Sequence, residues 1–128
     1  MKLTSKGRYA LQAVLDMIKH SNGRAVKLSD IADRQQISVQ YLAQLFRKLQ
    51  IKGVIVAQRG PGGGYLLKGS PEKVTAEQVL KGVGEDMDYN HTDIKEDDTA
   101  EKKSLAKFTE SLDLAIAKTL SISLQELL

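Results

Sequence analysis

Apolar residues recur at helical spacing near the start of the chain. The positions that share one face are Ala10, Ala13, Val14, Met17 and Ile18. This spacing predicts an amphipathic helix from about Thr4 to His20, with Thr4 or Ser5 as the N-cap. Asn22-Gly23 is typical of a turn and ends it.

Two further helices are predicted before residue 53. Leu28-Ser29-Asp30 opens a short one, with Ser29 as the expected cap. Ser38 opens the next, which continues to Lys52 and meets Gly53 at its end. The residues predicted on its inner face are Val39, Leu42, Leu45, Phe46 and Leu49. Those predicted on its outer face are Gln40, Tyr41, Gln44, Arg47 and Lys48.

A β-hairpin is predicted next. Two β-prone runs, residues 54–58 and 65–68, flank the Gly/Pro-rich segment 59–64. The loop is longer than a tight turn, so we expect it to project as a flexible tip. Thr75-Ala76-Glu77-Gln78 is a capping-box pattern that predicts a fourth helix through Val83.

The last third of the chain changes character. Residues 84–100 are polar and acidic and are expected to form a mobile loop. A long amphipathic helix is predicted from about Ala100 to Leu120, and Ser123 begins a last helical turn. The apolar stripe of the long helix consists of Leu105, Phe108, Leu112, Ala115 and Ile116. Such a stripe, outside a domain that already has a core, is typical of a dimerisation helix.

Together these elements predict a mainly α-helical fold with a small β-hairpin, the winged helix-turn-helix. Residues 1–83 form the expected DNA-binding domain, 84–100 the acidic loop, and 101–128 the dimerisation helix with its terminal turn. The segment Leu28–Leu49 matches the helix-turn-helix pattern, except that Gln36 stands where glycine is usual. We therefore expect a positive φ at Gln36.

Charge is divided unevenly along the chain. Residues 1–69 carry twelve Lys and Arg against three acids, a net charge of +9, whereas residues 70–128 carry a net charge of −6. This asymmetry favours a basic half that meets a polyanion. No cysteine is present, which excludes disulfides, thiolate metal sites and a Cys nucleophile. Without a membrane-length apolar run or a signal peptide, the expected location is the cytoplasm.

The predicted outer face of the third helix carries the chemistry of DNA recognition. Gln44 can pair with the N6 and N7 edge of adenine in the major groove, and Gln40 and Tyr41 can reach bases or phosphates. Arg47 and Lys48 suit phosphates, which position a protein without reading sequence.

Two other basic sites extend the expected contact with DNA. Arg59, raised by the glycine loop, suits a narrow minor groove. Lys6 and Arg8, with Lys2, lie at the start of the first helix, where free N–H groups favour phosphate.

Other interpretations remain open. Tyr41 can equally be a partly buried helix residue. His91 with Asp88 and Asp93 allows a metal sensor, although a solvated acidic loop fits these residues better. A protein-interaction module that has abandoned DNA is a further alternative. No Ser/His/Asp set or carboxylate pair supports an enzyme, and the glycine loop lacks the Lys-Ser/Thr ending of a phosphate loop.

Three segments resemble one known family: the opening LTSKGRYA at 3–10, ISVQYL at 37–42 and the wing RGPGGGYLL at 59–67. The sequence is similar to the iron–sulfur cluster regulator (IscR-like) family of bacterial winged-helix repressors, closely over residues 1–84. The resemblance implies a homodimer that binds a palindromic promoter site in duplex DNA. It places Ser38, Gln40, Tyr41 and Gln44 in the major groove. In the minor groove it places Arg59 with the loop residues Gly60, Pro61 and Gly62.

The sequence departs from this family in two respects. Ala43 stands where an acidic residue is common, and alanine cannot accept a hydrogen bond from cytosine. The three cysteines that hold an iron–sulfur cluster in relatives are absent, either naturally or by engineering, so no cofactor is expected. Some relatives, including the CymR-like repressors of cysteine metabolism, sense through a protein partner. A protein or small-molecule effector is therefore expected instead.

Overall fold

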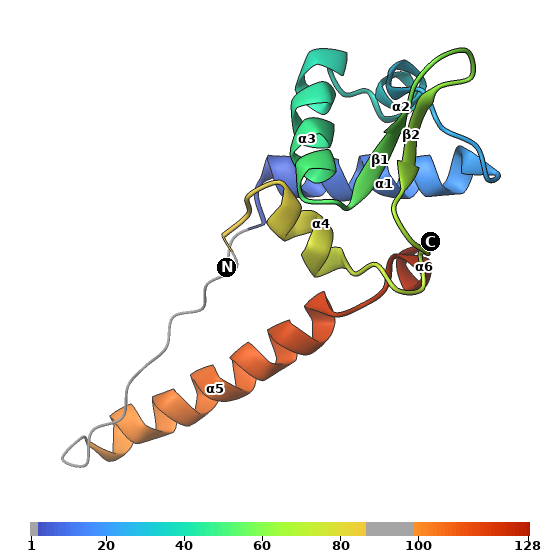
Figure 1. Cartoon of the computed structure of the whole chain (residues 1–128). Coiled ribbons are helices and arrows are strands. Elements are labelled where there is room, and N and C mark those ends of the chain that lie inside the picture. Colours follow the sequence, from blue (N-terminus) through green and yellow to red (C-terminus); the bar gives the residue numbers. More distant parts are fainter. Residues whose placement is uncertain (1–2, 87–98) are drawn as a thin grey trace.

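The order of elements is that of a winged helix followed by a long helix. The computed structural model describes residues 3–86 and 99–128. Its elements are α1 (Ser5–Ser21), α2 (Leu28–Gln35), α3 (Val39–Ile51), β1 (Ile55–Gln58), β2 (Gly64–Leu67), α4 (Ala76–Gly82), α5 (Ala100–Leu120) and α6 (Leu124–Leu127). Figure 1 shows the first residues of α3 and the loop of the hairpin on the same, upper side, with α5 on the opposite side. The predicted fold class is confirmed.

The core lies where α1, α3 and α4 meet. Its largest fully buried side chains are Phe46, Met17, Ile31, Leu42, Leu45, Leu49, Ile55, Leu124, Val14, Val79 and Val83. The predicted inner faces of α1 and α3 therefore form the core, with one exception. Val39 was placed on the inner face of α3 but is 41% exposed, because it is the first residue of the helix and precedes the point where α3 meets α1.

Two of the four predicted N-caps form as expected. Ser38 Oγ accepts a hydrogen bond from Tyr41 N at 3.3 Å, and Thr75 with Gln78 forms a complete capping box. The prediction for α2 was wrong, because the helix begins at Leu28 with Lys27 at the N-cap position and Ser29 already inside the first turn. Thr4 holds the N-cap position of α1 but makes no side-chain cap, since its hydroxyl bonds elsewhere.

The hairpin is fastened to the helices by a third piece of extended chain. β1 and β2 pair antiparallel, with Ile55 opposite Leu67 and Gln58 opposite Gly64. Beyond this pair, Val26 and Tyr65 exchange two backbone hydrogen bonds of 2.9 and 2.8 Å. The loop between α1 and α2 thus fixes the wing against the helical body.

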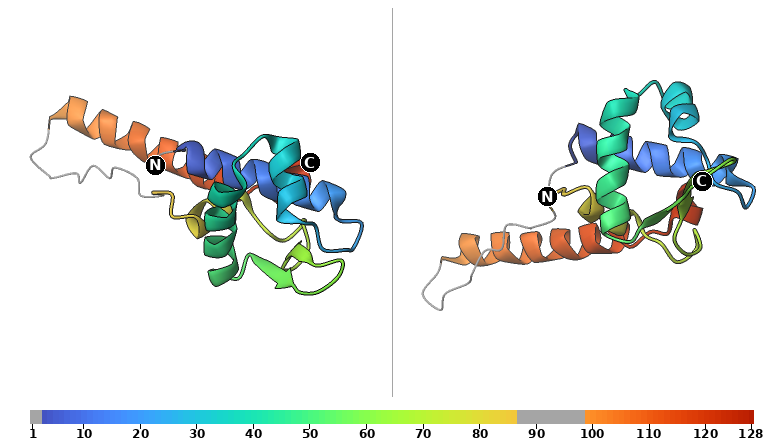
Figure 2. Two further views of the ribbon diagram at one scale, coloured as in Figure 1. Left: turned by 90° about the horizontal axis from the view of Figure 1, so that it is seen from above. Right: turned by 45° about the horizontal axis from the view of Figure 1, so that its top comes forward.

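The C-terminal segment leaves the body and then returns to it. Figure 2 shows α5 extending well past the body, while α6 lies back against the body. Backbone hydrogen bonds from Ala76 N to Ile122 O and from Leu124 N to Val74 O join this return to the start of α4. Leu124 is fully buried. Among the described residues, every helix is too short or too polar to span a lipid bilayer.

Residues 87–98, most of the expected acidic loop, lie outside the described residues, as do His91, Asp88 and Asp93. Glu85, near the start of the expected loop 84–100, is described and is buried, with 6% of its surface exposed. It contacts Thr4 at the start of α1. The domain boundary at residue 83 remains a prediction, but Glu85 belongs to the folded body.

Candidate nucleic-acid interface

Most of the outer face of α3 is exposed. Gln40, Gln44, Arg47 and Lys48 are solvent-exposed, and the helix contains no acidic residue. Ser38 caps the helix and its hydroxyl also donates to Gln40 Oε1 at 3.1 Å. This face presents hydrogen-bonding groups next to positive charge, which is the chemistry needed for base edges and phosphates.

Tyr41 is half-buried rather than fully presented. Its ring meets the Tyr9 ring edge-on, with the ring centroids 6.0 Å apart. Tyr9 is 39% exposed. The contact ties the first turn of α3 to the first turns of α1, so that both elements reach the same surface. The alternative view of Tyr41 as a partly buried residue agrees with this position.

The turn between α2 and α3 has the predicted left-handed residue. Gln36 adopts φ 55° and ψ 47°, and its N–H donates to carbonyls at the end of α2. Ile37 is buried beneath the turn. Glutamine replaces the usual glycine here at the modest conformational cost of a left-handed non-glycine residue.

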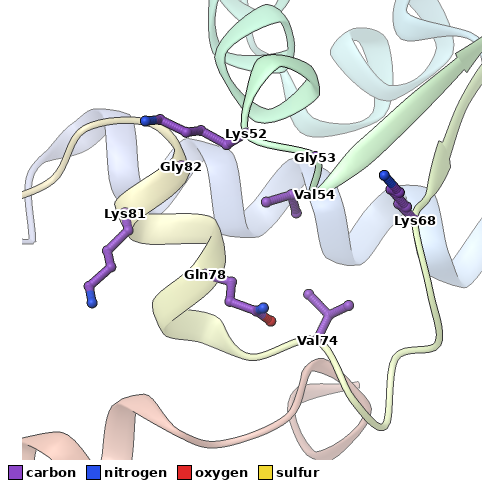
Figure 3. A pocket seen from close by; sticks show the side chains of 8 residues that line it. All are labelled: Lys52, Gly53, Val54, Lys68, Val74, Gln78, Lys81 and Gly82. Carbon is purple, nitrogen blue, oxygen red and sulfur yellow. The ribbon is translucent and has the colours of Figure 1, made fainter.

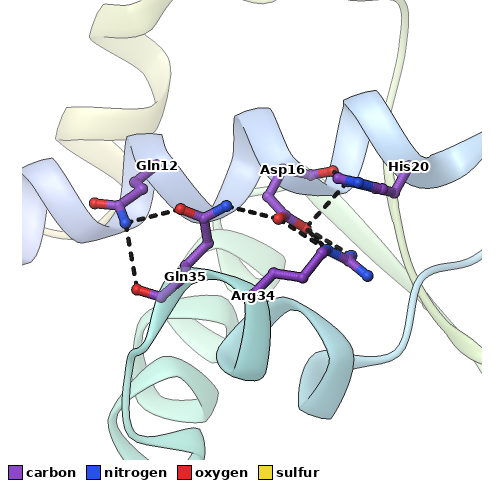
Figure 4. Close-up of polar contacts among 5 residues, drawn as sticks. All are labelled: Gln12, Asp16, His20, Arg34 and Gln35. Carbon is purple, nitrogen blue, oxygen red and sulfur yellow. Dashed lines mark hydrogen bonds and ion pairs between the residues drawn. The ribbon is translucent and has the colours of Figure 1, made fainter.

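An ion pair between the buried Asp16 and the solvent-exposed Arg34 holds this turn against α1. Asp16 is 4% exposed and accepts hydrogen bonds from Arg34 Nη2 at 2.7 Å and from Gln35 Nε2 at 2.7 Å. Gln12 donates to Gln35, and His20 Nδ1 lies 3.6 Å from Asp16 Oδ1 (Figure 4). Burial raises the pKa of Asp16, but the hydrogen bonds from Arg34 and Gln35 and the charges of Arg34 and His20 outweigh it and lower that pKa.

The wing carries Arg59, Gly60, Pro61 and Gly62 at its tip, and all four are exposed. At the base, the Tyr65 ring meets the Phe46 ring edge-on at 5.2 Å between centroids, which links the wing to the core side of α3. Gly64 lies against the backbone of Val26, where a Cβ atom would overlap the carbonyl. These contacts attach the wing to the body at its base, with its basic tip in solvent.

Sequence reasoning missed two basic residues beside the wing. Arg24 and Lys27 line a hollow of about 250 Å³ together with Gly62 and Gly63 of the wing. Lys27 also holds the N-cap position of α2, next to the N–H groups of its first turn. Because the hollow joins segments nearly forty residues apart, no local pattern could have identified it. Both residues are candidates for phosphate contact.

The start of α1 differs from the expectation. Glu85 accepts hydrogen bonds from Thr4 N and Thr4 Oγ1, both at 2.6 Å, and its Oε1 lies 3.9 Å from Lys6 Nζ. A carboxylate therefore lies beside the start of α1, where the sequence led us to expect phosphate. Arg8 is exposed and remains available. Lys6 and Arg8 stay predictions as DNA contacts.

The predicted dimerisation residues form an uncovered stripe on α5. Leu105 is 55%, Phe108 63% and Leu112 46% exposed. Ala115 and Ile116 continue the stripe and line a shallow, mainly apolar hollow of about 210 Å³ with Thr119 and Leu120. In the single chain nothing described covers these side chains.

Known proteins share both the sequence and the fold. The family described as Rrf2, iron-dependent transcriptional regulator, matches residues 3–128. A relative named HTH-type transcriptional regulator IscR from Pectobacterium carotovorum is 49% identical over 88 residues, which cover 69% of this chain and 54% of the relative. The chain spans about half the length of the curated relatives it matches.

Solved structures match over almost the whole chain. The structure of CymR, the global cysteine regulator of B. subtilis, aligns with a TM-score of 0.79 at 26% identity, covering 99% of this chain and 95% of that one. IscR of T. potens aligns with a TM-score of 0.72 at 30% identity, covering 99% and 85%. These relatives are named as regulators rather than enzymes.

The helix-turn-helix, the glycine-rich wing and the long helix beyond them are thus shared with these regulators over residues 3–128. The chain belongs to the Rrf2 family of transcriptional regulators.

Proposed function

We propose that the protein is a homodimeric, sequence-specific repressor that binds palindromic promoter sites in the cytoplasm without an iron–sulfur cluster. One observation carries this proposal: the acid-free outer face of α3 and the basic tip of the wing lie exposed on the same side of the molecule (Figure 1). A helix and a wing so arranged fit the major groove and the adjoining minor groove of one duplex.

Base reading is assigned to the first half of α3. Gln44 contacts an adenine edge, and Ser38, Gln40 and Tyr41 contact bases or phosphates near the helix start. Ala43, exposed between them, offers no acceptor for a cytosine amino group, so this protein prefers a different site from relatives with an acid there.

Residues proposed to contact the DNA backbone and the minor groove surround the base-reading residues. Arg47 and Lys48 reach phosphates beside the major groove, and Arg59 with Gly60, Pro61 and Gly62 enters the minor groove. Arg24 and Lys27 extend the contact along the backbone between the wing and α2.

A cluster does not fit the donor set of this chain. The sequence contains no cysteine, and iron–sulfur clusters are held by thiolates. The family description, iron-dependent regulator, and the IscR-named relatives therefore do not transfer a cofactor to this protein. Its signal is instead a protein or small-molecule effector.

Selection of genomic fragments by the purified protein at 50 and 200 mM salt tests the function. We expect a few palindromic promoter fragments, with affinity falling about 10³-fold or more between the two salt concentrations if some six phosphates are contacted. A salt slope near zero, or recovery of random DNA alone, would overturn the proposal.

Two matched variants test the assigned roles. Gln44→Ala is expected to weaken binding by about 1–3 kcal/mol through a single base pair, whereas Arg47→Ala weakens all sequences alike and reduces the salt slope by about one. Affinity for a panel of single-base operator variants measures both. Equal losses across the panel for both variants would contradict the division between reading and positioning.

A second candidate is a regulator controlled through a protein partner, favoured by the match to CymR over 95% of that chain. A protein-interaction module without DNA binding is the extreme form of this candidate. Capture of a partner by the tagged protein, unchanged by DNase, together with loss of fragment selection, would favour that form.

A further inference from the structure

A hollow of about 350 Å³ lies between the end of α3, the base of the wing and α4. It is lined by Lys52, Gly53, Val54, Lys68, Val74, Gln78, Lys81 and Gly82. Figure 3 shows Lys68 at the wing side of Val54, Gln78 pointing from α4 toward Val74, and the Lys52 and Lys81 side chains extending along the α4 side, away from Val54. Its volume is at the lower end of the range for small-molecule sites.

The lining is cationic and contains no acid. Lys52, Lys68 and Lys81 line it, and Lys81 Nζ is paired with Glu77 Oε1 at 2.8 Å, so the positive charge of the hollow rests mainly on Lys52 and Lys68. Lysines at the ends of α3 and α4 complement the negative ends of those helices. That explanation does not extend to Lys68, which follows β2 and belongs to no helix.

Gln78 supplies an oriented hydrogen-bond donor. Its Oε1 accepts from Thr75 N at 2.8 Å in the capping box, which fixes the side chain. Because Oε1 accepts the hydrogen bond at the start of α4, the amide nitrogen Nε2 can donate to a ligand. A fixed amide donor in the same hollow as lysine ammonium groups suits an anionic ligand.

The hollow lies at the opposite end of α3 from the residues assigned to base reading. Lys52 follows the last residue of α3 and Ser38 precedes the first, so they are about 20 Å apart along a 13-residue helix. The lysines of the hollow are therefore not needed for contact with the same duplex that the first turns of α3 would read.

We infer that this hollow binds a small polyanion, a metabolite with two or more carboxylate or phosphate groups. A ligand there would touch α3, the wing and α4 together, and thus bias the position of the wing relative to α3. This regulatory role rests on the proposed DNA-binding function, whereas binding of the anion does not.

Calorimetric titration of the full chain with citrate and with pyrophosphate, at ionic strength matched by chloride, tests the site and distinguishes carboxylate from phosphate ligands. We expect saturable binding of at least one. Lys68→Gln and Gln78→Glu weaken it about tenfold or more, because each removes a donor to the anion. Gln78→Glu keeps an acceptor for the capping box. The control Lys107→Gln, on exposed α5, leaves binding unchanged.

Affinity for a selected operator, with and without the bound anion, tests the coupling. We expect the anion to change the affinity of the parent chain but not that of Gln78→Glu. Absence of saturable binding by both probes, or equal binding by all variants, would overturn the site. The site would also be overturned if, without anion, Lys68→Gln bound DNA more weakly and with a smaller salt slope. Lys68 would then be a contact to DNA phosphate.

The two proposals fail separately. DNA binding without saturable anion binding removes the effector site alone. Saturable anion binding by a chain that selects no DNA removes the repressor function and leaves the site.

Discussion

Asp16 shows how one side chain can position a recognition element. It lies in α1, yet its carboxylate accepts hydrogen bonds from Arg34 and Gln35. These two residues end α2, immediately before the turn that leads into α3. A buried carboxylate is stable only when such partners satisfy it. The orientation of α3 relative to α1 therefore depends on this residue as well as on the apolar core.

We expect Asp16→Ala to lower the free energy of unfolding by about 1–3 kcal/mol at pH 7, since it removes the buried acceptor of the hydrogen bonds from Arg34 and Gln35. Urea unfolding measures this. Asp33→Ala, an exposed acid on the same α2, is the matched control and should change stability by less than about 0.5 kcal/mol. Equal effects of the two substitutions would contradict a structural role for the pair.

The same pair has a defined pH dependence. The pKa of Asp16 in the folded protein lies below its ordinary value of 3.8, so its contribution is complete above that value and is lost as pH falls through the lowered pKa. The stability difference between the parent chain and Asp16→Ala should therefore be constant near neutrality and shrink on acidification below about pH 4. Unfolding curves at a series of pH values check this; a difference that grows on acidification would refute it.

At the scale of elements, the wing depends on a close approach of two backbones. Gly64 adopts φ 152° and lies against Val26, and the adjacent Tyr65 shares two hydrogen bonds with that residue. A side chain at position 64 would push β2 away from the loop between α1 and α2. The glycine-rich motif thus serves the attachment of the wing as well as its flexible tip.

Gly64→Ala is expected to destabilise the protein by about 2 kcal/mol or more, from backbone overlap and strain together. Gly62→Ala is the control, because φ is 75° there but the space around it is open, so only about 1 kcal/mol of conformational cost remains. Thermal unfolding measures the stability of the two variants. Similar losses for both would show that wing attachment does not depend on this contact.

At the scale of the whole molecule, the exposed stripe on α5 requires a second copy under the proposed function. Leu105, Phe108 and Leu112 lie along one side of a 21-residue helix and are about half exposed in the single chain. Burial of such side chains against their equivalents drives the association of helices. A palindromic site then follows from the two-fold symmetry of the pair.

Phe108→Glu with Leu112→Glu is expected to give a folded monomer, since neither side chain belongs to the described core. Loss of the second half-site should weaken binding to a full palindrome about 10²-fold or more, and leave half-site binding unchanged. Leu114→Glu is the control: Leu114 is 67% exposed but lies about 200° around the helix from Leu112. Sedimentation and operator titration measure both, and a dimeric double variant would contradict the proposed interface.

The local features of this fold were readable from the sequence. The Ser38 cap, the Thr75–Gln78 capping box, the left-handed Gln36 and the antiparallel hairpin were all predicted. Each is determined by residues only a few positions apart, whose preferences act before the chain is folded. The outer face of α3 was predicted for the same reason, since helical periodicity alone decides which side chains point outward.

The tertiary structure alone decided the contacts between distant segments. Asp16 meets Arg34, Glu85 meets Thr4, and Arg24 lies in the same hollow as the wing. Nothing in the neighbouring sequence specifies these partners, because they are chosen by the way the core places one element against another. For that reason the sequence did not reveal the carboxylate beside the start of α1 or the hollow that Arg24 and Lys27 form beside the wing.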